Sequence, residues 1–235
     1  MRIAGTNILR AILLALCLSL PCTLAANELS AEEFLAEIRR PLAQDVWGEI
    51  TGRITHQRTG QSRLNGELRL RVSFSSSSLH AQITLYDKSI YGFEQHHPVG
   101  EPVNCKLNLP EPETKPGLFD FGLEPEDLSF SFIYWDFIEE LPAQKNRSRT
   151  CRVMRLAHPG NKSQVEVWFD AEYGFPLLAK WFKEDGHTLW RSLEMKGAKK
   201  HQNGLWFVKE MRLDGEDWKT RVIFDFASLK DIGSQ

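Results

Sequence analysis

Apolar and polar residues alternate with a period of two over most of this chain. In "LRLRVSF" the apolar residues Leu68, Leu70, Val72 and Phe74 alternate with charged or polar ones, and "HAQITLYD" repeats the pattern. Such alternation is typical of strands with one buried and one solvated face, which favours an antiparallel sheet. Beyond Leu141, six further runs are separated by turn sequences such as "EDGH" and "HQNG". The pattern therefore predicts a mainly β fold of about ten or eleven strands in one curled antiparallel sheet.

A helix is predicted near the start of the mature chain, where "LSAEEF" carries two helix-start devices. Ser30 and Glu33 have the spacing of a capping box, and Leu29 and Phe34 occupy the positions of a hydrophobic staple. The helix is expected to end near Arg40 because a proline follows.

A second helix is predicted from "EPEDLSFSFIYWDF", which ends at Phe137. Pro125 suits a first helical position, and the acidic residues after it suit the positive end of the helix dipole. Strand periodicity competes, because Phe130, Phe132 and Tyr134 also alternate. The start signals decide for a helix, and its aromatic side chains need a large apolar surface to cover.

Between the two helices, residues 94–123 are irregular and rich in proline. We expect a short strand near Val103 to Leu107, followed by a long connection. Connections of this length are functional or mobile in many compact domains, and a plain linker is the alternative.

The N-terminus has the features of an export signal. Arg2 and Arg10 precede the apolar run "AILLALCLSL", and small residues that end at Ala25 form a cleavage site. Cys17 and Cys22 follow Leu and Pro, where a lipoprotein signal has a small residue, so no lipid anchor is expected. The predicted organisation is a signal peptide over residues 1–25 and a single domain over residues 26–235, located in the periplasm.

Charge and cysteine content narrow the function. The chain has 29 Lys and Arg against 31 Asp and Glu, and the signal contains two of the arginines and no acid. A weakly acidic mature protein argues against nucleic acid as a partner. Cys105 and Cys151 are the cysteines left after cleavage, and in an oxidising compartment they form either a disulfide or two separate buried thiols.

The sequence contains none of the common catalytic motifs, such as a G-x-S-x-G elbow, an H-E-x-x-H pair or a phosphate-binding glycine loop. We therefore expect a non-enzymatic protein without a cofactor. Glu94, His96, His97 and Cys105 are metal-ligand types, but neighbouring histidines on a strand point to opposite faces, which favours solvated side chains. The basic run from Lys196 is either a solvated hairpin end or a membrane-surface patch.

Three segments together resemble a known family. They are "EPEDLSFSFIYWDF", the run from "CRVMRLAHPGNK" to "LWRSLEM", and "NGLWFVKEMRLDGEDWKTRVIFDF". In order and spacing they are similar to the outer-membrane lipoprotein-sorting (LolA-like) proteins over roughly Phe119 to Phe226. The resemblance implies an unclosed antiparallel β-barrel with a helical lid, whose apolar interior holds acyl chains. The long proline-rich middle departs from that pattern.

The resemblance implies that the protein is a periplasmic carrier. It would bind the acyl chains of a lipid or lipoprotein and move that ligand towards the outer membrane. Its partners would be acyl chains and envelope transport proteins, with transient membrane contact by a monomer. The alternative is a sensor or scaffold domain of the same fold that binds envelope proteins. From the apolar faces and the aromatic lid, the residues expected to contact the ligand are Leu70, Phe74, Ile83, Phe130, Phe132, Trp135, Phe169 and Phe207.

Overall fold

The computed structural model describes residues 29–40, 45–75, 77–96, 104–110, 116–197, 199–200 and 206–231. The expected export signal and His97 lie outside these residues. The helices within them are α1 (Ala31–Ile38), η1 (Phe119–Phe121), α2 (Pro125–Ser129) and η2 (Ser131–Tyr134), where η marks a 3-10 helix. The strands are β1 (Val46–Arg58), β2 (Leu64–Phe74), β3 (Ser78–Leu85), β4 (Ser89–His96), β5 (Asn104–Asn108), β6 (Asp136–Asn146), β7 (Arg149–Ala157), β8 (Gln164–Asp170), β9 (Pro176–Phe182), β10 (Leu189–Lys196), β11 (Lys199–Lys200), β12 (Trp206–Phe207), β13 (Glu210–Gly215) and β14 (Trp218–Asp231).

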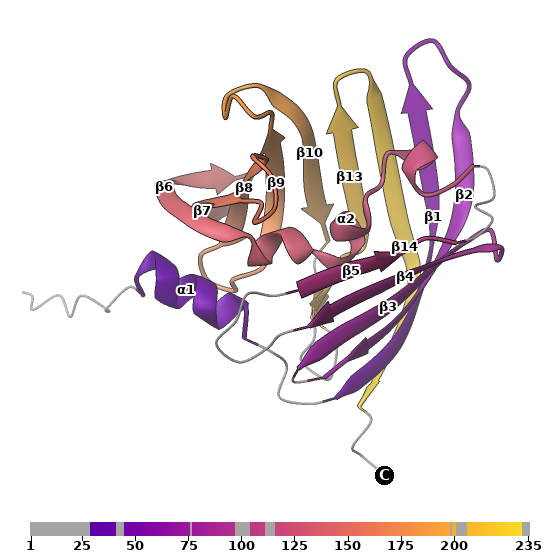
Figure 1. The fold of residues 1–235 in the computed structure, drawn as a ribbon, viewed down its shortest axis with the longest axis horizontal. Helices are drawn as coiled ribbons and strands as arrows, with labels where there is room; N and C mark the ends of the chain where they lie inside the picture. Colours follow the sequence, from indigo (N-terminus) through magenta and orange to yellow (C-terminus); the bar gives the residue numbers. More distant parts are fainter. Residues whose placement is uncertain are drawn as a thin grey trace, which may run out of the picture.

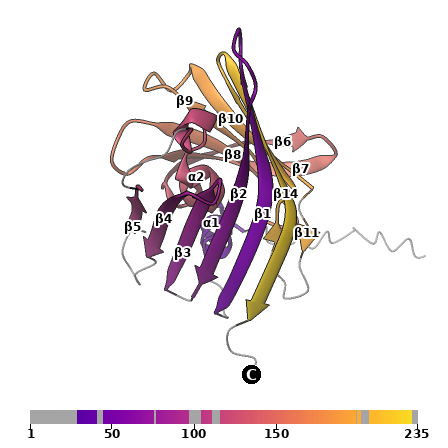
Figure 2. The same cartoon turned by 90° about the vertical axis from the view of Figure 1, so that its right-hand side faces the viewer.

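Twelve of these strands form one sheet, in the order β5-β4-β3-β2-β1-β14-β13-β10-β9-β8-β7-β6, while β11 and β12 form a separate small ribbon. The pairings are antiparallel, and β5 and β6 are the two ends of the order. Figure 1 shows the sheet curling so that its concave face surrounds α2, with α1 below β6, β7 and β8, and Figure 2 shows strands β1 to β4 of this curl from the side. The predicted unclosed antiparallel barrel is confirmed, with twelve strands in its sheet.

The two halves of the sheet meet where β1 pairs with β14. The register of this pair shifts between Thr51 and Gly52. A Cβ atom at Gly52 would lie 2.4 Å from the carbonyl oxygen of Ile223, so any larger residue would push β14 away. Glycine is therefore required for the close approach of the two longest strands.

Helix α1 forms as predicted. The side chain of Ser30 accepts a hydrogen bond from the Glu33 amide, and the Glu33 carboxylate accepts one from the Ser30 amide at 2.8 Å. Phe34 and Leu35 are buried. The Phe34 ring packs edge-on against Phe169 with centroids 6.1 Å apart, which places α1 against the β7 and β8 side of the concave face.

The predicted aromatic helix is shorter than expected, and this is a correction. Helix α2 starts at Pro125 as predicted but ends at Ser129, because Phe130 adopts a left-handed conformation with φ of 56°. Helix η2 follows, and β6 begins at Asp136. The helix-start signals were read correctly, whereas the end of the helix is set by tertiary contacts of the aromatic side chains.

Two strand predictions also need correction. The run "GLWFVKEMRLD", expected as one strand, is divided between β12 and β13. Strand β6 lies partly in the segment expected to be helical. It is the edge of the sheet, carries Pro142 at a register shift and is mostly exposed, which is how natural edge strands avoid pairing with other chains. The strand expected near Val103 to Leu107 is confirmed as β5.

The interior of the barrel is divided into a solid part and a hollow part. Around Leu68, the fully buried side chains of Leu118, Phe121 and Leu123 fill the space between the strands. A Cβ atom at Gly66 would lie 2.8 Å from the Phe121 ring, so this end is closely packed. Further along β2, the inward-facing residues border a cavity instead.

Strands β7 and β8 are apolar on both faces. Val165, Val167 and Phe169 belong to the main core, while Trp168 packs with Cys151 and Val153 in a second, smaller cluster.

Candidate functional site

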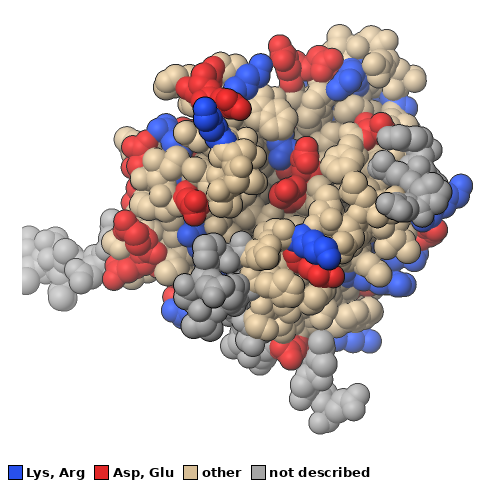
Figure 3. Space-filling view, in the orientation of Figure 1, with Lys and Arg blue, Asp and Glu red and all other residues tan. Residues whose placement is uncertain are grey.

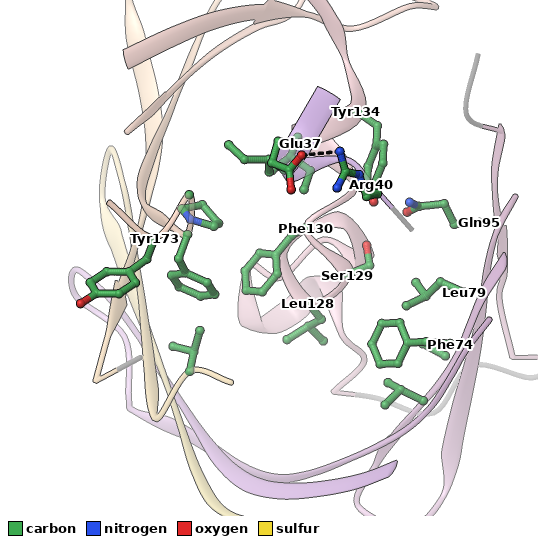
Figure 4. Close-up of a pocket in the computed structure, with 18 of the residues that line it drawn as sticks. Glu37, Arg40, Phe74, Leu79, Gln95, Leu128, Ser129, Phe130, Tyr134 and Tyr173 are labelled. Atoms are coloured by element: carbon green, nitrogen blue, oxygen red, sulfur yellow. Dashed lines mark ion pairs between the residues drawn. The ribbon is translucent and has the colours of Figure 1, made fainter. Parts of the chain in front are cut away.

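A cavity of about 670 Å³ lies between the concave face of the sheet and the lid segments, within the range of about 300 to 1,000 Å³ typical of small-molecule sites. Figure 4 shows Leu128, Ser129 and Phe130 on the α2 side, with Phe74 and Leu79 on the strands to the right and the Phe130 ring directed away from them. The lining residues come from α1, α2, η2, strands β1 to β4, the turn between β8 and β9, and strands β13 and β14.

The floor of the cavity is apolar because alternate residues of adjacent strands point to the same face. Leu70 and Val72 on β2 lie beside Ile50 on β1. Met211 on β13 and Phe224 on β14 continue this floor. The period of two seen in the sequence thus produces one continuous apolar wall.

The roof is made by the lid segments. Phe34 and Ile38 line the cavity from α1, and Leu128 and Ile133 line it from α2 and η2. Phe175, in the turn after β8, closes one side. Both helices therefore turn their apolar faces to the hollow part of the interior, with the sheet on the opposite side.

Phe130 lies at the end of α2 in a conformation that is unfavourable for a residue with a large side chain. Its φ of 56° is a position where glycine is normally preferred at a helix end. The ring borders the cavity and packs edge-on against Phe132 and Phe175, with centroids 6.1 and 6.4 Å apart. This backbone strain, on the order of 1 to 2 kcal/mol, is thus located at the cavity wall.

Arg39 holds the two lid segments together. From the C-cap of α1, its guanidinium donates hydrogen bonds to the carbonyl oxygens of Ile133 at 2.8 Å and Trp135 at 2.7 Å. Burial lowers the pKa of Arg39, while Tyr134 and Asp136 oppose this effect. The group stays charged, and charged donors form the stronger hydrogen bonds.

Helix α2 is fixed to the sheet by a buried ion pair. The Arg191 guanidinium on β10 lies 2.9 Å from the Asp127 carboxylate, and the same carboxylate oxygen accepts a hydrogen bond from the Glu124 amide. Arg191 also stacks on the Trp181 ring at 4.2 Å. Burial raises the pKa of Asp127, and the nearby Arg191 opposes that shift. Breaking such a pair by removing one partner is costly, which keeps α2 in place.

Polar groups at the cavity are few and lie mainly at its rim. Glu37 and Arg40 on the α1 side form a mostly exposed ion pair at 2.5 Å, drawn in Figure 4. Inside, the buried Gln95 lines the wall beside Tyr134, which bonds to it; burial raises the pKa of that tyrosine. The space-filling view in Figure 3 shows acidic and basic side chains interspersed on the visible face rather than gathered by sign.

The structure places the sequence-predicted residues in three groups. Leu70, Phe74 and Phe130 line the cavity. Ile83, Phe132 and Phe169 are buried in the solid core beside it, and Trp135 packs against that core with its ring 4.8 Å from His158. The side chain of Phe207 lies outside the described part of the chain.

The sequence reasoning missed several residues of the cavity wall. Phe224 was visible as an alternate residue of "TRVIFDF", and Phe175 follows a turn signal in "AEYG". Ile38 stands four residues after Phe34, which is the spacing of one helical face. The sequence therefore indicated that these three residues are apolar positions of the interior. It could not show whether they pack against other side chains or line a cavity.

Of the two alternatives that the sequence leaves for Cys105 and Cys151, the structure has separate thiols, of which Cys151 alone is buried. Cys105 is an exposed free thiol on β5 and Cys151 a buried free thiol on β7. The Cys151 thiol lies 3.7 Å from the carbonyl oxygen of Arg149 and packs beside Val153 in the second cluster. β5 ends the sheet at one side and β7 lies next to the opposite edge, so the two cysteines belong to different halves of the barrel.

The histidine segment shows no metal-binding group in the described ranges. The His96 ring packs edge-on against His80, with centroids 5.8 Å apart. At the basic run, Lys196 pairs with Glu194 at 2.9 Å. No helix of the described chain is long and apolar enough to span a membrane.

No protein-family model matches the sequence, and no curated protein is significantly similar to it. Solved structures do share its fold. A domain from Vibrio parahaemolyticus, named for outer membrane lipoprotein sorting, has a TM-score of 0.67 at 17% identity and covers 86% of this chain and 93% of its own.

Two further structures agree with this fold. A DUF1329 family protein from Desulfovibrio piger has a TM-score of 0.63 at 14% identity, covering 86% of this chain and 90% of its own. A LolA superfamily protein from Nitrosomonas europaea has a TM-score of 0.56 at 9% identity, covering 87% and 95%. The LolA-like fold predicted from the sequence is confirmed.

Proposed function

From this shared fold, we propose that the protein is a non-enzymatic periplasmic carrier that binds acyl chains of a lipid or lipoprotein and moves them towards the outer membrane. The observation that carries the proposal is the apolar cavity of about 670 Å³ under the lid formed by α1, α2 and η2. The names of the similar structures, which refer to lipoprotein sorting and to the LolA superfamily, support the same ligand class.

The driving force for binding is the burial of the acyl chain. Each methylene removed from water contributes about 0.8 kcal/mol. Fifteen buried methylenes would supply about 12 kcal/mol, from which an association cost of at least about 4 kcal/mol must be subtracted. Micromolar affinity, near 8 kcal/mol, is therefore attainable without any specific polar contact.

The lid supplies the means of loading and release. α1 and the α2–η2 segment are joined through the two hydrogen bonds of Arg39, so a partner that separates them would open the cavity. We propose envelope transport proteins as the donor and acceptor, transient membrane contact during transfer, and a monomer between these steps. Cleavage near Ala25 would release the domain into the periplasm.

A matched pair of variants tests whether the cavity is the binding site. Ala81 lines the cavity on β3, and its neighbour Gln82 is exposed on the opposite face. Ala81→Phe fills part of the cavity and should weaken binding of a fluorescent fatty acid at least tenfold, whereas Gln82→Phe adds the same ring outside and should leave binding unchanged. Equal effects of both variants, or no binding by the wild-type protein at micromolar concentration, would reject the proposal.

A further inference from the structure

The strands of the barrel define two different ends of the cavity. On β4, Tyr91 accepts a hydrogen bond from the Leu118 amide at 2.8 Å, and both residues are fully buried in the core that closes the barrel. Four residues further along β4, Gln95 lines the cavity close to the turn between β2 and β3, where Ser75 and Ser78 also line it. We call this end, defined by Ser75, Ser78 and Gln95, the polar end of the cavity.

Gln95 is a polar residue in an inward-facing row of β4. Phe93, two residues earlier, points to the same face and belongs to the apolar core. Gln95 is as deeply buried, with 2% of its surface exposed, and it bonds with Tyr134 of η2. Figure 4 shows Gln95 and Tyr134 together on one side of the cavity. An amide and a hydroxyl can each form more than one hydrogen bond, so their contact with one another is compatible with further bonds to a ligand.

The charged residues of the cavity lie outside this polar end. Among the described lining residues they are Glu37, Arg40 and Glu172, and each of these side chains is more than half exposed. Burial raises the pKa of Tyr134, and the nearby charge of Arg39 partly offsets this rise. Since Arg39 precedes Arg40, the rim lies beside the polar end. From the rim inwards, the cavity thus presents charged groups, then neutral hydrogen-bonding groups, then the apolar floor.

An acyl lipid has the same order of polarity, with a head group, a carbonyl linkage and then a hydrocarbon chain. We propose that Gln95 and Tyr134 form a subsite for the carbonyl group that joins an acyl chain to its head group, in an ester or an amide. This inference rests on the proposed function and adds the contact that orients the ligand. The head group stays at the rim with Glu37 and Arg40, and the chain extends over the floor towards Leu70.

The chemistry of the two side chains suits this role. The Gln95 amide and the Tyr134 hydroxyl supply N–H and O–H donors for a carbonyl oxygen. A ligand with a hydrocarbon or ether group at this point would exclude water from both side chains without replacing its hydrogen bonds, and this lowers affinity. The subsite therefore favours acyl ligands over alkyl ligands of equal length.

Two lysolipids that differ in the linkage alone test the subsite. 1-Palmitoyl-lysophosphatidylcholine carries an ester carbonyl, whereas 1-hexadecyl-lysophosphatidylcholine carries an ether in its place. Each competes with a fluorescent fatty acid for the mature protein, below the critical micelle concentration of the lysolipid. We expect the ester to bind about tenfold more tightly, which corresponds to about 1.4 kcal/mol. An analogue with an amide at the same point distinguishes the two linkages, and it should also bind more tightly than the ether.

Matched variants assign the preference to residues. Gln95→Leu and Tyr134→Phe remove hydrogen-bonding groups at nearly constant size, and Gln82→Leu makes the same change at an exposed residue of β3. The preference for the ester should fall to about threefold or less in the first two variants and persist in Gln82→Leu. A purely structural role of Gln95 would weaken both lysolipids equally. If Gln95→Leu does not fold in urea-unfolding controls, Tyr134→Phe, which removes one oxygen atom, carries the same test.

Infrared spectroscopy of the bound ester, isotope-labelled at its carbonyl carbon, reports the hydrogen bond itself. The carbonyl band should lie at lower wavenumber in the wild-type complex than in the Gln95→Leu or Tyr134→Phe complex. Equal affinities of ester and ether for the wild-type protein, or a preference that both variants retain, would overturn the subsite and leave the carrier function standing. Failure of every acyl ligand to bind, the fluorescent fatty acid included, would overturn the carrier function as well.

Discussion

Truncating Phe132 to Ala should destabilise the protein far more than truncating Phe130, although the two residues are neighbours in the lid. Phe132 is fully buried, and its ring packs edge-on against Trp181 with centroids 5.1 Å apart. Removing about 170 Å² of buried ring at about 25 cal/mol per Å² costs about 4 kcal/mol. This lies within the range of about 3 to 5 kcal/mol measured for such truncations.

Phe130 should behave differently because its ring borders the cavity and is only half-buried. We expect Phe130→Ala to cost about 1 to 2 kcal/mol of stability and to weaken fatty-acid binding about tenfold, or about 1.4 kcal/mol. Phe130→Gly should be more stable than Phe130→Ala by about 1 kcal/mol, because glycine tolerates the left-handed conformation. In an ordinary helical position the order would be reversed.

Urea unfolding followed by tryptophan fluorescence measures both free energies, with the slope of the transition as a check that the unfolded state is unchanged. Binding is measured on the same preparations by fluorescent fatty-acid titration. The reasoning would be refuted if Phe132→Ala cost less than about 2 kcal/mol, or if Phe130→Ala cost as much stability as Phe132→Ala while binding stayed intact.

Three further predictions concern the polar contacts. Arg39→Ala should speed the release of bound fatty acid about tenfold in stopped-flow displacement. The reason is that the loss of two charged hydrogen bonds can readily supply about 1.4 kcal/mol, which corresponds to a tenfold change. An unchanged release rate would show that Arg39 does not hold the lid segments together. Asp127→Ala should cost about 3 to 5 kcal/mol in urea unfolding by leaving Arg191 buried and unpaired, and a cost below 1 kcal/mol would show that the pair does not hold α2. The hydrogen bond from Arg221 lowers the pKa of Glu210 to about 2, so its contribution is present above the unfolded pKa and lost as the pH falls towards 2. Glu210→Gln should therefore reduce stability at pH 7 and have no effect near pH 2, and an equal effect at both values would rule out this linkage.

Most of the sheet was predictable because strands such as β2 and β3 carry a period of two, whereas the edge strands β5 and β6 do not. β2 shows this in the alternation of Leu68, Leu70 and Val72 with arginines. Helix α1 was predictable for a similar reason, since its capping box is a local device formed by Ser30 and Glu33. Features that depend on residues close together in the sequence could thus be inferred without knowledge of the fold.

The end of α2 was not predictable because its causes are not local. Phe130 takes a conformation that its own propensity opposes, so that Phe132 can reach Trp181 while Phe130 borders the cavity. In the same way, alternation placed Ile83 and Phe169 on the apolar faces of their strands, and nothing in it showed that they are buried in the core rather than lining the cavity.

The cysteines illustrate a third limit. Counting cysteines after signal cleavage left a disulfide or two free thiols as alternatives. The choice depends on strand order, because β5 is one end of the sheet and β7 lies next to the other end. Strand order in a curled sheet follows from long-range pairing, such as β1 with β14, which composition and spacing do not encode locally.

The central claim is that acyl chains bind inside the barrel beneath the lid. Photo-crosslinking with a fatty acid that carries a diazirine at its terminal carbon tests this directly, because peptide mass spectrometry identifies the residues that the chain end reaches. The account predicts crosslinks to the floor of the cavity, at Leu70, Val72, Met211 or Phe224, that are lost when excess palmitate is added. Crosslinks confined to exposed residues on the outer face, or crosslinks that excess palmitate does not reduce, would contradict it.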